Sequence, residues 1–241
     1  ALTLTASNNN STWYAITYKT LTVTFNANGA SLTGTTAPTC DIYNAETSCS
    51  VTAPTITRSG FTITGFNTSS SATTSQVSSG GTATVSANTT YYAITSKVVT
   101  VTFYRNNASS ITPSGGSAST ATSLTQQCTI RNSATTCNIT SPSIQAPTNT
   151  PTVLGWNTSS SSTSSAWSVS TAKAFSSNAS YYAITTKAAV TLTAKFNANG
   201  ATLSSTSNLT CTLAATYNGT AQATSCTVTA PSITRSGYNI V

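Results

Sequence analysis

The sequence predicts a mainly β protein, built as a tandem array of one small module. Three observations support this prediction: a segment that recurs three times, the alternation of apolar and polar residues typical of strands, and one pair of cysteines in each repeat. The recurring segment is Tyr-Ala-Ile-Thr, at residues 14–17, 92–95 and 182–185. Self-similarity over a long interval is the sequence signature of a repeat protein.

The repeat has the size of a small independent domain, about 80 to 90 residues. Different markers of the repeat drift by different amounts, which places the insertions in the connections between strands. We expect a closing strand of a preceding module at 1–18, a first module at 19–96, a second module at 97–186 and the opening part of a third module at 187–241.

Each module is expected to open with a strand that ends at a phenylalanine. Leu21, Val23 and Phe25 alternate with threonines, which predicts one apolar face directed inwards. The same alternation ends at Phe103 in the second module and at Phe196 in the third. We expect the opening strand of every module to contribute its apolar face to a core.

Further strands follow the opening strand. Asn-Ala-Asn-Gly at 26–29 and at 197–200 predicts a turn in which the glycine takes a positive φ. Later strands are expected near 49–53, 61–66 and 83–95. No window combines helical periodicity with helix-forming residues, so any helical turn is expected in the Ser/Thr stretch that follows Gly-Phe-Asn-Thr or Gly-Trp-Asn-Thr.

The cysteines predict one local disulfide in each module. Cys40 and Cys49 enclose eight residues, Cys128 and Cys137 also enclose eight, and Cys211 and Cys226 enclose fourteen. Six cysteines allow fifteen connectivities, and the repeat selects the local one. Such a bond stabilises a module by roughly 3 kcal/mol in the chain-entropy description. Persistent disulfides indicate an extracellular or cell-surface protein.

Composition excludes most catalytic chemistry. Charged residues make up 5% of the 241 residues, histidine is absent, and Asp41 and Glu46 are the only carboxylates. Ordinary soluble domains carry about 25% charged residues. Acid–base catalysis, glycoside cleavage and metal cages all need side chains that this chain lacks. We therefore expect no enzyme activity, no catalytic residue, no metal site and no cofactor.

The surplus of basic residues does not point to nucleic acid. The chain has nine Lys and Arg and a net charge of +7, but these residues are spread singly along the sequence. Phosphate-tracking surfaces cluster Lys and Arg with interleaved aromatics. We expect no nucleic-acid partner and no membrane span in this segment. Arg58 and Arg235, in Arg-Ser-Gly turns, are interpreted as solvated loop residues, and the aromatic rings beside glycine, such as Trp156, as core.

Asn-x-Ser/Thr sequons are frequent in the chain. Two pairs of them occupy equivalent positions in the first and second modules, and glycans are expected there as possible partners. These sites are Asn67, Asn88, Asn157 and Asn178.

A family resemblance rests on three segments that occur in a fixed order. They are Val-Thr-Phe-Asn-Ala-Asn-Gly at 23–29, Ala-Pro-Thr-Ile-Thr-Arg-Ser-Gly-Phe-Thr-Ile-Thr-Gly-Phe-Asn-Thr at 53–68 and Thr-Tyr-Tyr-Ala at 90–93. This order resembles the Listeria–Bacteroides repeat, the B-repeat of internalin B. The resemblance implies β-grasp-like modules strung along a bacterial surface protein. The chain departs from the family in its disulfides and in its scarcity of acids.

The first strand of the sequence matches the end of a module, and the last residues match the middle of one. Either the chain is a window of a longer array, or its first strand completes the open third module of a neighbouring copy by strand addition. Both explanations lead to a polymer, because head-to-tail contacts that do not close form a filament. The residues expected to form this assembly strand are Leu2, Leu4, Trp13, Tyr14 and Ile16.

We therefore expect a structural subunit of an extracellular filament or cell-surface stalk that polymerises head to tail, with itself as partner. The alternative is a surface adhesin or carbohydrate-binding repeat protein whose loop aromatics hold sugar. Trp156 of the second module is replaced by Phe66 in the first. Because a multivalent binder is expected to repeat its site chemistry in every copy, this variation favours the scaffold.

Overall fold

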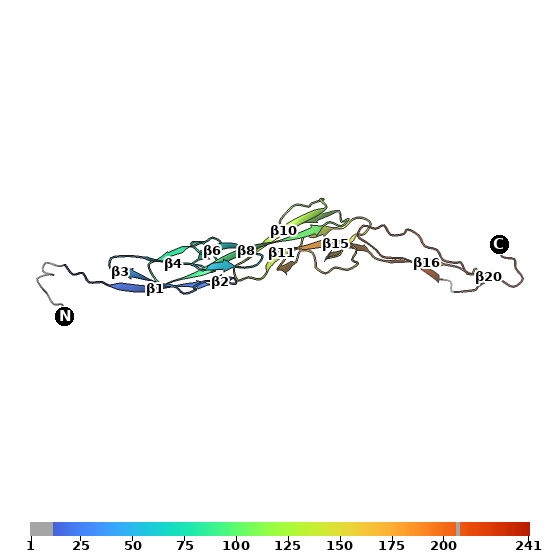
Figure 1. Cartoon of the computed structure of the whole chain (residues 1–241). Coiled ribbons are helices and arrows are strands. Elements are labelled where there is room, and N and C mark those ends of the chain that lie inside the picture. The colour runs from blue at the N-terminus through green and yellow to red at the C-terminus, as the bar shows by residue number, and fades with distance from the viewer. Residues whose placement is uncertain (1–11, 206–207) are drawn as a thin grey trace. The chain divides into compact units, whose positions relative to one another are not determined.

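The computed structural model describes residues 12–205 and 208–241 and is built from strands, with no helix among these residues (Figure 1). The mainly β fold predicted from the sequence is therefore confirmed. In the Ser/Thr stretch where a helical turn was expected, the Ala72 N–H donates to the Ser69 carbonyl at 3.3 Å. This bond closes one turn and no helix follows from it, since the next residues form bends.

Internal contacts divide the chain into two compact units. The first consists of Ala1–Val98 with Thr129–Cys137, and the second of Val99–Cys128 with Asn138–Val241. The first unit thus contains the first predicted module together with the tip of a hairpin from the second module. Each unit is described separately below.

The strands follow one another in the order expected for a repeat. In the first module they are β1 (Tyr18–Asn26), β2 (Ser31–Thr33), β3 (Thr39–Tyr43), β4 (Cys49–Thr52), β5 (Thr55–Thr57), β6 (Thr62–Asn67) and β7 (Thr82–Val85). One 16-residue strand, β8 (Thr89–Tyr104), holds both the closing strand of the first module and the opening strand of the second.

The later strands repeat the pattern of the first seven. They are β9 (Ser110–Thr112), β10 (Ser123–Arg131), β11 (Cys137–Thr140), β12 (Ser143–Gln145), β13 (Thr152–Asn157), β14 (Ala172–Phe175), β15 (Ala179–Lys187), β16 (Val190–Lys195), β17 (Thr202–Leu203), β18 (Asn208–Leu213), β19 (Thr216–Tyr217) and β20 (Ile233–Thr234).

The core of the first unit forms where an opening strand and a closing strand run parallel. β1 pairs with β8 in parallel register, which sets Phe25 opposite Tyr91. β6 lies antiparallel to β8 on its other side and brings in Phe66. The Phe25 ring packs against Phe66 at 4.9 Å and against Tyr91 at 5.7 Å between centroids. All three rings are buried, as the alternating pattern predicted for Phe25.

Two short two-stranded sheets cover this core. β2 pairs antiparallel with β5 and places Leu32 opposite Ile56, while β4 pairs antiparallel with β7. β3 pairs along the outer edge of β1. The Cys40–Cys49 disulfide joins β3 to β4 and so ties the edge of the main sheet to the two-stranded sheet of β4 and β7.

The second unit repeats the same arrangement with different aromatics. The later half of β8 pairs parallel with β15, which sets Phe103 opposite Tyr181. Phe103 packs against Trp156 at 4.9 Å between ring centroids, and Trp156 forms an isolated bridge with Trp167. Both tryptophans are buried, which confirms the interpretation of Trp156 as a core residue.

A glycine shapes the strand that carries the core aromatic in both complete modules. The register of β6 shifts between Ile63 and Gly65, and Gly65 has a φ of 133°. A Cβ at Gly65 would lie 2.4 Å from the Val77 carbonyl oxygen. Gly155 repeats both the φ and the crowding, at 2.6 Å from the Trp167 carbonyl oxygen. Only glycine fits a bulge of this shape.

The positive φ predicted for the glycine in the turn after an opening strand is confirmed. The residue before that glycine also has a positive φ. Gly29 has a φ of 86°, and Asn28 before it has a φ of 47°. In the second module Asn106 and Asn107 occupy these two positions with φ values of 46° and 66°. Asparagine tolerates this left-handed conformation better than other residues with a side chain, which explains the replacement of glycine.

The third opening strand differs from the prediction. Leu192 on β16 is 39% exposed, whereas its equivalents Leu21 and Val99 are 0% exposed. β16 pairs with β18 and, among the described residues, has no strand on its other edge. The expected inward face of β16 is therefore uncovered. In the earlier modules a parallel closing strand covers this face, and among the described residues β16 has no such partner.

We expect Gly65→Ala to lower the free energy of unfolding of the first unit by about 2–4 kcal/mol, because it adds backbone strain and a clash with a carbonyl. Gly60→Ala is the matched control, since Gly60 also has a positive φ, of 73°, but no atom within 4 Å of the added Cβ. Chemical denaturation of both variants measures the difference. Equal losses would show that crowding at Gly65 is unimportant.

Candidate assembly surfaces

The described residues contain no group of three or more His, Cys, Asp or Glu side chains that could hold a metal ion. One surface depression of the first unit is lined by Thr33, Pro38, Val51, Thr52 and Pro54, among other small residues, and none of its lining side chains is aromatic or charged. Such a lining offers no acidic or basic side chain and no ring for stacking on a sugar. The distinctive surfaces of the chain are instead the joints between modules and the exposed apolar face of an opening strand.

The structure places the described part of the predicted assembly strand in solvent. Trp13 is 61% exposed, Ile16 is 77% exposed, and Tyr14 is also exposed. Ile94, the equivalent of Ile16 in the first closing strand, is 2% exposed. Leu2 and Leu4 lie outside the described residues. Residues that form a core in the complete modules therefore lie on the surface at the start of the chain.

An uncovered apolar face occurs also in the third module. Leu192 and Ile233 are both exposed, whereas Ile56, the equivalent of Ile233, is buried. Phe196 is only half-buried, in contrast to Phe25. This face contains the opening strand and the two-stranded sheet of β17 and β20, but no closing strand among the described residues.

The first unit contains a joint between the first module and a hairpin tip of the second. We call hairpin tips the turns at 43–46, 131–134 and 217–220, which lie inside the three disulfide hairpins. The backbone N–H of Asn132 donates to the Thr95 carbonyl at 2.9 Å, and the Thr95 N–H donates to Asn132 Oδ1 at 3.2 Å. Asn132 is buried and has a φ of 52°. The tip is thereby paired with the end of the closing strand.

The side-chain amide of Asn132 also holds a serine loop, which we define as residues 69–72. Asn132 Nδ2 donates to the Ser70 carbonyl at 2.8 Å and to the Ala72 carbonyl at 3.2 Å. Asn28 Nδ2 donates to the same Ser70 carbonyl at 2.9 Å and to the Ala93 carbonyl at 3.0 Å. One loop is therefore held by two amides, one from its own module and one from the next.

Arg58 completes the first joint. Its guanidinium donates to Thr95 Oγ1 at 2.9 Å, to the Ala134 carbonyl at 2.9 Å and to the Asn132 carbonyl. It lies over the Phe61 ring, with Cζ 3.6 Å from the centroid. Burial lowers the pKa of the Arg58 guanidinium, which nonetheless stays charged at neutral pH. The interpretation of Arg58 as a solvated loop residue was wrong, because three acceptors of the joint converge on it.

The second unit contains a joint with the same bonds. The Asn218 N–H donates to the Thr185 carbonyl at 2.9 Å, and the Thr185 N–H donates to Asn218 Oδ1 at 3.3 Å. Asn218 Nδ2 donates to the Ser160 carbonyl at 3.0 Å, which also accepts from Asn106 Nδ2 at 2.9 Å. The position of Arg58 is taken here by Thr150, whose Oγ1 accepts from a backbone N–H of the tip at 3.0 Å.

The remaining hairpin tip, 43–46, makes the two bonds to a threonine but, among the described residues, no bond to a serine loop. The Asn44 N–H donates to the Thr17 carbonyl at 2.8 Å, and the Thr17 N–H donates to Asn44 Oδ1 at 3.0 Å. Asn44 has a φ of 51°, matching Asn132 and Asn218. Among the described residues, no acceptor is bonded to Asn44 Nδ2, which in the other two tips binds a serine loop.

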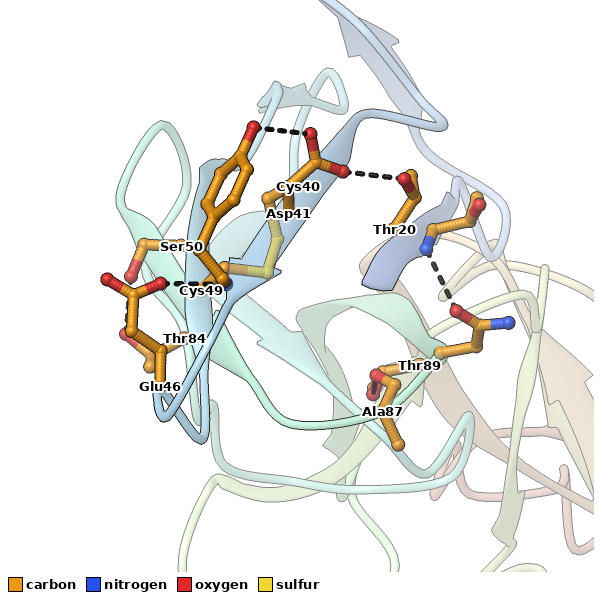
Figure 2. The surroundings of a disulfide bond; sticks show 12 residues. Thr20, Cys40, Asp41, Glu46, Cys49, Ser50, Thr84, Ala87 and Thr89 are labelled. Atoms are coloured by element: carbon orange, nitrogen blue, oxygen red, sulfur yellow. Dashed lines mark hydrogen bonds between the residues drawn. A yellow bond between two sulfur atoms is a disulfide. The ribbon is translucent and has the colours of Figure 1, made fainter. Parts of the chain in front are cut away.

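Both carboxylates of the chain lie in this same hairpin (Figure 2). Asp41 accepts from the Thr20 hydroxyl at 2.6 Å and from the Tyr43 hydroxyl at 3.1 Å. This hydrogen bond and the charge of Asp41 raise the pKa of the Tyr43 hydroxyl. Glu46 Oε2 accepts from the Tyr43 N–H at 3.0 Å and thereby holds its carboxylate against the turn. Asp41 thus binds within its own module, while Glu46 stays at the exposed tip.

Disulfides secure all three hairpins. The structure joins Cys40 to Cys49 and Cys211 to Cys226, with Cα atoms 5.9 Å and 6.1 Å apart. Cys128 and Cys137 are also disulfide-bonded, and no cysteine is free. The hairpin tips are therefore presented on covalently closed loops, which limits the conformations that each tip can adopt.

The predicted glycosylation sites fall into two structural kinds. Asn88 and Asn178 are exposed, and their Oδ1 atoms accept from backbone N–H groups of the neighbouring opening strands, each at 2.9 Å. Asn67 and Asn157 are half-buried, and their Nδ2 atoms donate to carbonyls of their own loops, at 3.0 Å and 2.9 Å. A glycan needs the Nδ2 atom, so the first pair is the better placed of the two. Glycosylation stays a prediction.

The sequence reasoning missed the residues that form the joints, Asn28, Asn44, Asn132, Asn218 and Arg58. A usable signal was present, since an asparagine follows the first cysteine by four residues in the first two hairpins and recurs in the third. It was hidden by the abundance of asparagine in turns, where this residue is common for local reasons.

Comparisons with protein-family models, with curated proteins and with solved structures gave no match. The resemblance to the Listeria–Bacteroides repeat therefore stays a prediction. Within the described residues, no helix is long and apolar enough to cross a membrane.

We expect Asn132→Ala to destabilise the first unit by about 1–3 kcal/mol, because the Ser70 and Ala72 carbonyls of the serine loop lose the hydrogen bonds that this amide donates. Asn44→Ala is the matched control: it has the same left-handed backbone and the same bonds to a threonine, but no serine loop. Its loss is expected to be smaller by about 1 kcal/mol or more. Chemical denaturation of the two monomeric variants tests this, and equal losses would contradict the assigned role of the amide.

Proposed function

We propose that this chain is a non-enzymatic structural subunit of an extracellular filament or cell-surface stalk, and that it polymerises head to tail. The observation that carries the proposal is a match between two exposed surfaces. The segment before β1, which is not in a strand at residues 12–17, exposes the side chains equivalent to those that close a module, and the third module exposes the face that a closing strand covers in the earlier modules.

The two complete modules define how the surfaces fit. In both of them an opening strand pairs in parallel with a closing strand, and the last aromatic of one faces an aromatic of the other: Phe25 faces Tyr91, and Phe103 faces Tyr181. The same register sets Phe196 of one copy opposite Trp13 of the next. Burial of rings of this size contributes about 2–3 kcal/mol each.

A polar contact fits the same register. Asn28 and Asn106 donate to the carbonyls of Ala93 and Ala183 in their closing strands, at 3.0 Å and 2.9 Å. Asn199 is the equivalent residue of the third module and also has a left-handed backbone, with a φ of 45°. Its partner in a neighbouring copy is the Ala15 carbonyl. The added strand is thus fixed by side-chain and main-chain bonds, as in other strand additions.

Location outside the cell is supported by the disulfides, which persist in oxidising compartments. The resemblance to the Listeria–Bacteroides repeat supports the same location and a reading of the repeats as β-grasp-like modules of a bacterial surface protein. Sugars on the exposed sequons at Asn88 and Asn178 would lie on the surface of such a stalk.

The alternative, an adhesin or carbohydrate-binding repeat protein, has less support. Trp156 and Trp167 are buried and pack against Phe103, so neither ring face is offered to a sugar. Trp13 is the exposed tryptophan of the described residues. Its equivalents Tyr91 and Tyr181 are core residues, which favours a role in closing a module.

The strand-completion proposal predicts that Trp13→Ser with Ile16→Ser abolishes end-to-end growth of the full chain. Both side chains would be buried in the completed module, and their loss removes about 4–5 kcal/mol of apolar burial from each contact. Tyr18→Ser is the control, because Tyr18 is similarly exposed but its equivalent Ser96 lies outside the core. Electron microscopy and sedimentation of the purified chains measure filament formation.

A wild-type chain of residues 1–241 that stays monomeric at high concentration would overturn the proposal. So would a Trp13→Ser, Ile16→Ser variant whose filaments match those of the wild type, since other contacts would then build the polymer.

A further inference from the structure

The three hairpin tips are equivalent, but within the part of the chain that the structure describes only two of them dock fully on a module. Asn132 binds Thr95 and the serine loop of the first unit, and Asn218 binds Thr185 and the serine loop of the second. Asn44 has the same turn, the same φ and the same two bonds to a threonine. The tip at 43–46 therefore has the shape of a docking element with part of its surface unoccupied among the described residues.

A matching receptor is present in the third module. Arg235 is the equivalent of Arg58, and it lies over the Tyr238 ring with Cζ 4.1 Å from the centroid, as Arg58 lies over Phe61. Arg235 is exposed, and among the described residues its side chain has no hydrogen-bond acceptor. Stacking on the ring limits the rotamers of the guanidinium, so it is held in the arrangement that Arg58 uses to bind a tip.

We propose that the tip at 43–46 of one copy of this chain docks on the third module of another copy, where Arg235 binds it. By equivalence with Arg58, the guanidinium donates to the carbonyls of Asn44 and Glu46 and lies beside the Glu46 carboxylate. The inference rests on the proposed head-to-tail function and names a second contact of that assembly. Its partner is a second copy of this chain.

The distribution of charge gives this contact its specificity. The residues equivalent to Glu46 are Ala134 and Thr220, and the threonine Thr150 takes the place of Arg58 in the second joint. Arg58 is already bound by the tip at 131–134, so an unoccupied arginine faces a carboxylate when tip 43–46 meets Arg235. The tips at 131–134 and 217–220 carry no carboxylate, and the first of them contains Arg131, so neither can offer this pairing. The charge therefore selects the correct end of the neighbouring chain.

The test is a charge-reversal cycle in the full chain, with the critical concentration for polymerisation as the readout. Glu46→Lys in the wild-type background replaces attraction by repulsion at Arg235, and we expect the critical concentration to rise by about tenfold. In the Arg235→Glu background the same Glu46→Lys change creates attraction, and the critical concentration is expected to fall. Asp41→Lys is the control for net charge, because Asp41 binds Thr20 and Tyr43 within its own module.

The reversal of sign distinguishes a direct contact from a general effect of charge or folding. If Glu46→Lys has the same effect in both backgrounds, the contact between Glu46 and Arg235 is excluded, while filament growth by the wild type leaves the strand-completion proposal intact. If the wild type forms no filaments, both proposals fail. High salt gives an independent check: 1 M NaCl should remove the difference between wild type and Glu46→Lys, since an exposed ion pair is screened at that ionic strength.

Discussion

The fold of each module depends on one interaction, the parallel pairing between its first and its last strand. Parallel strands need a long connection, and here nearly the whole module forms that connection. The pairing joins Phe25 to Tyr91 in the first unit and Phe103 to Tyr181 in the second, and the rings around these pairs make the core. Until the last strand is in place, the apolar face of the first is uncovered, as Leu192 on β16 illustrates.

With so few charges, the chain relies on asparagine amides to hold its loops and joints. An amide can donate two bonds and accept two, and Asn132 uses this capacity to bind Thr95 and the serine loop at once. The left-handed backbone of these asparagines turns the chain and aims the amide in the same residue. Because the bonds end on main-chain carbonyls, the sequence of the serine loops can vary without loss of the joint.

The sequence predicted what depends on local pattern. Alternation located the opening strands and their inward face at Phe25 and Phe103, glycine located the turns, and cysteine spacing indicated local disulfides. It did not predict the joints, because the partners of Arg58 and Asn132 are backbone carbonyls of distant loops. Every residue has a backbone carbonyl, so no residue type marks the ones that accept these bonds. It also failed for Leu192, because alternation shows which face is apolar but not whether another strand is available to cover it.

One pairing rule serves both folding and the proposed assembly. β8 carries the last strand of one module and the first strand of the next in a single element, so the pairing at its two halves is repeated without a linker between them. A chain that exposes a segment equivalent to a last strand, together with an uncovered first strand, presents the two halves of this pairing on different surfaces. Strand completion would then supply affinity through buried rings, while the tip at 43–46 would determine which ends of two chains meet, because only this tip carries a carboxylate, that of Glu46. Because the two contacts have separate roles, similar modules can join in one order. The buried rings alone would accept any closing strand of the array, and the charged tip selects the correct one.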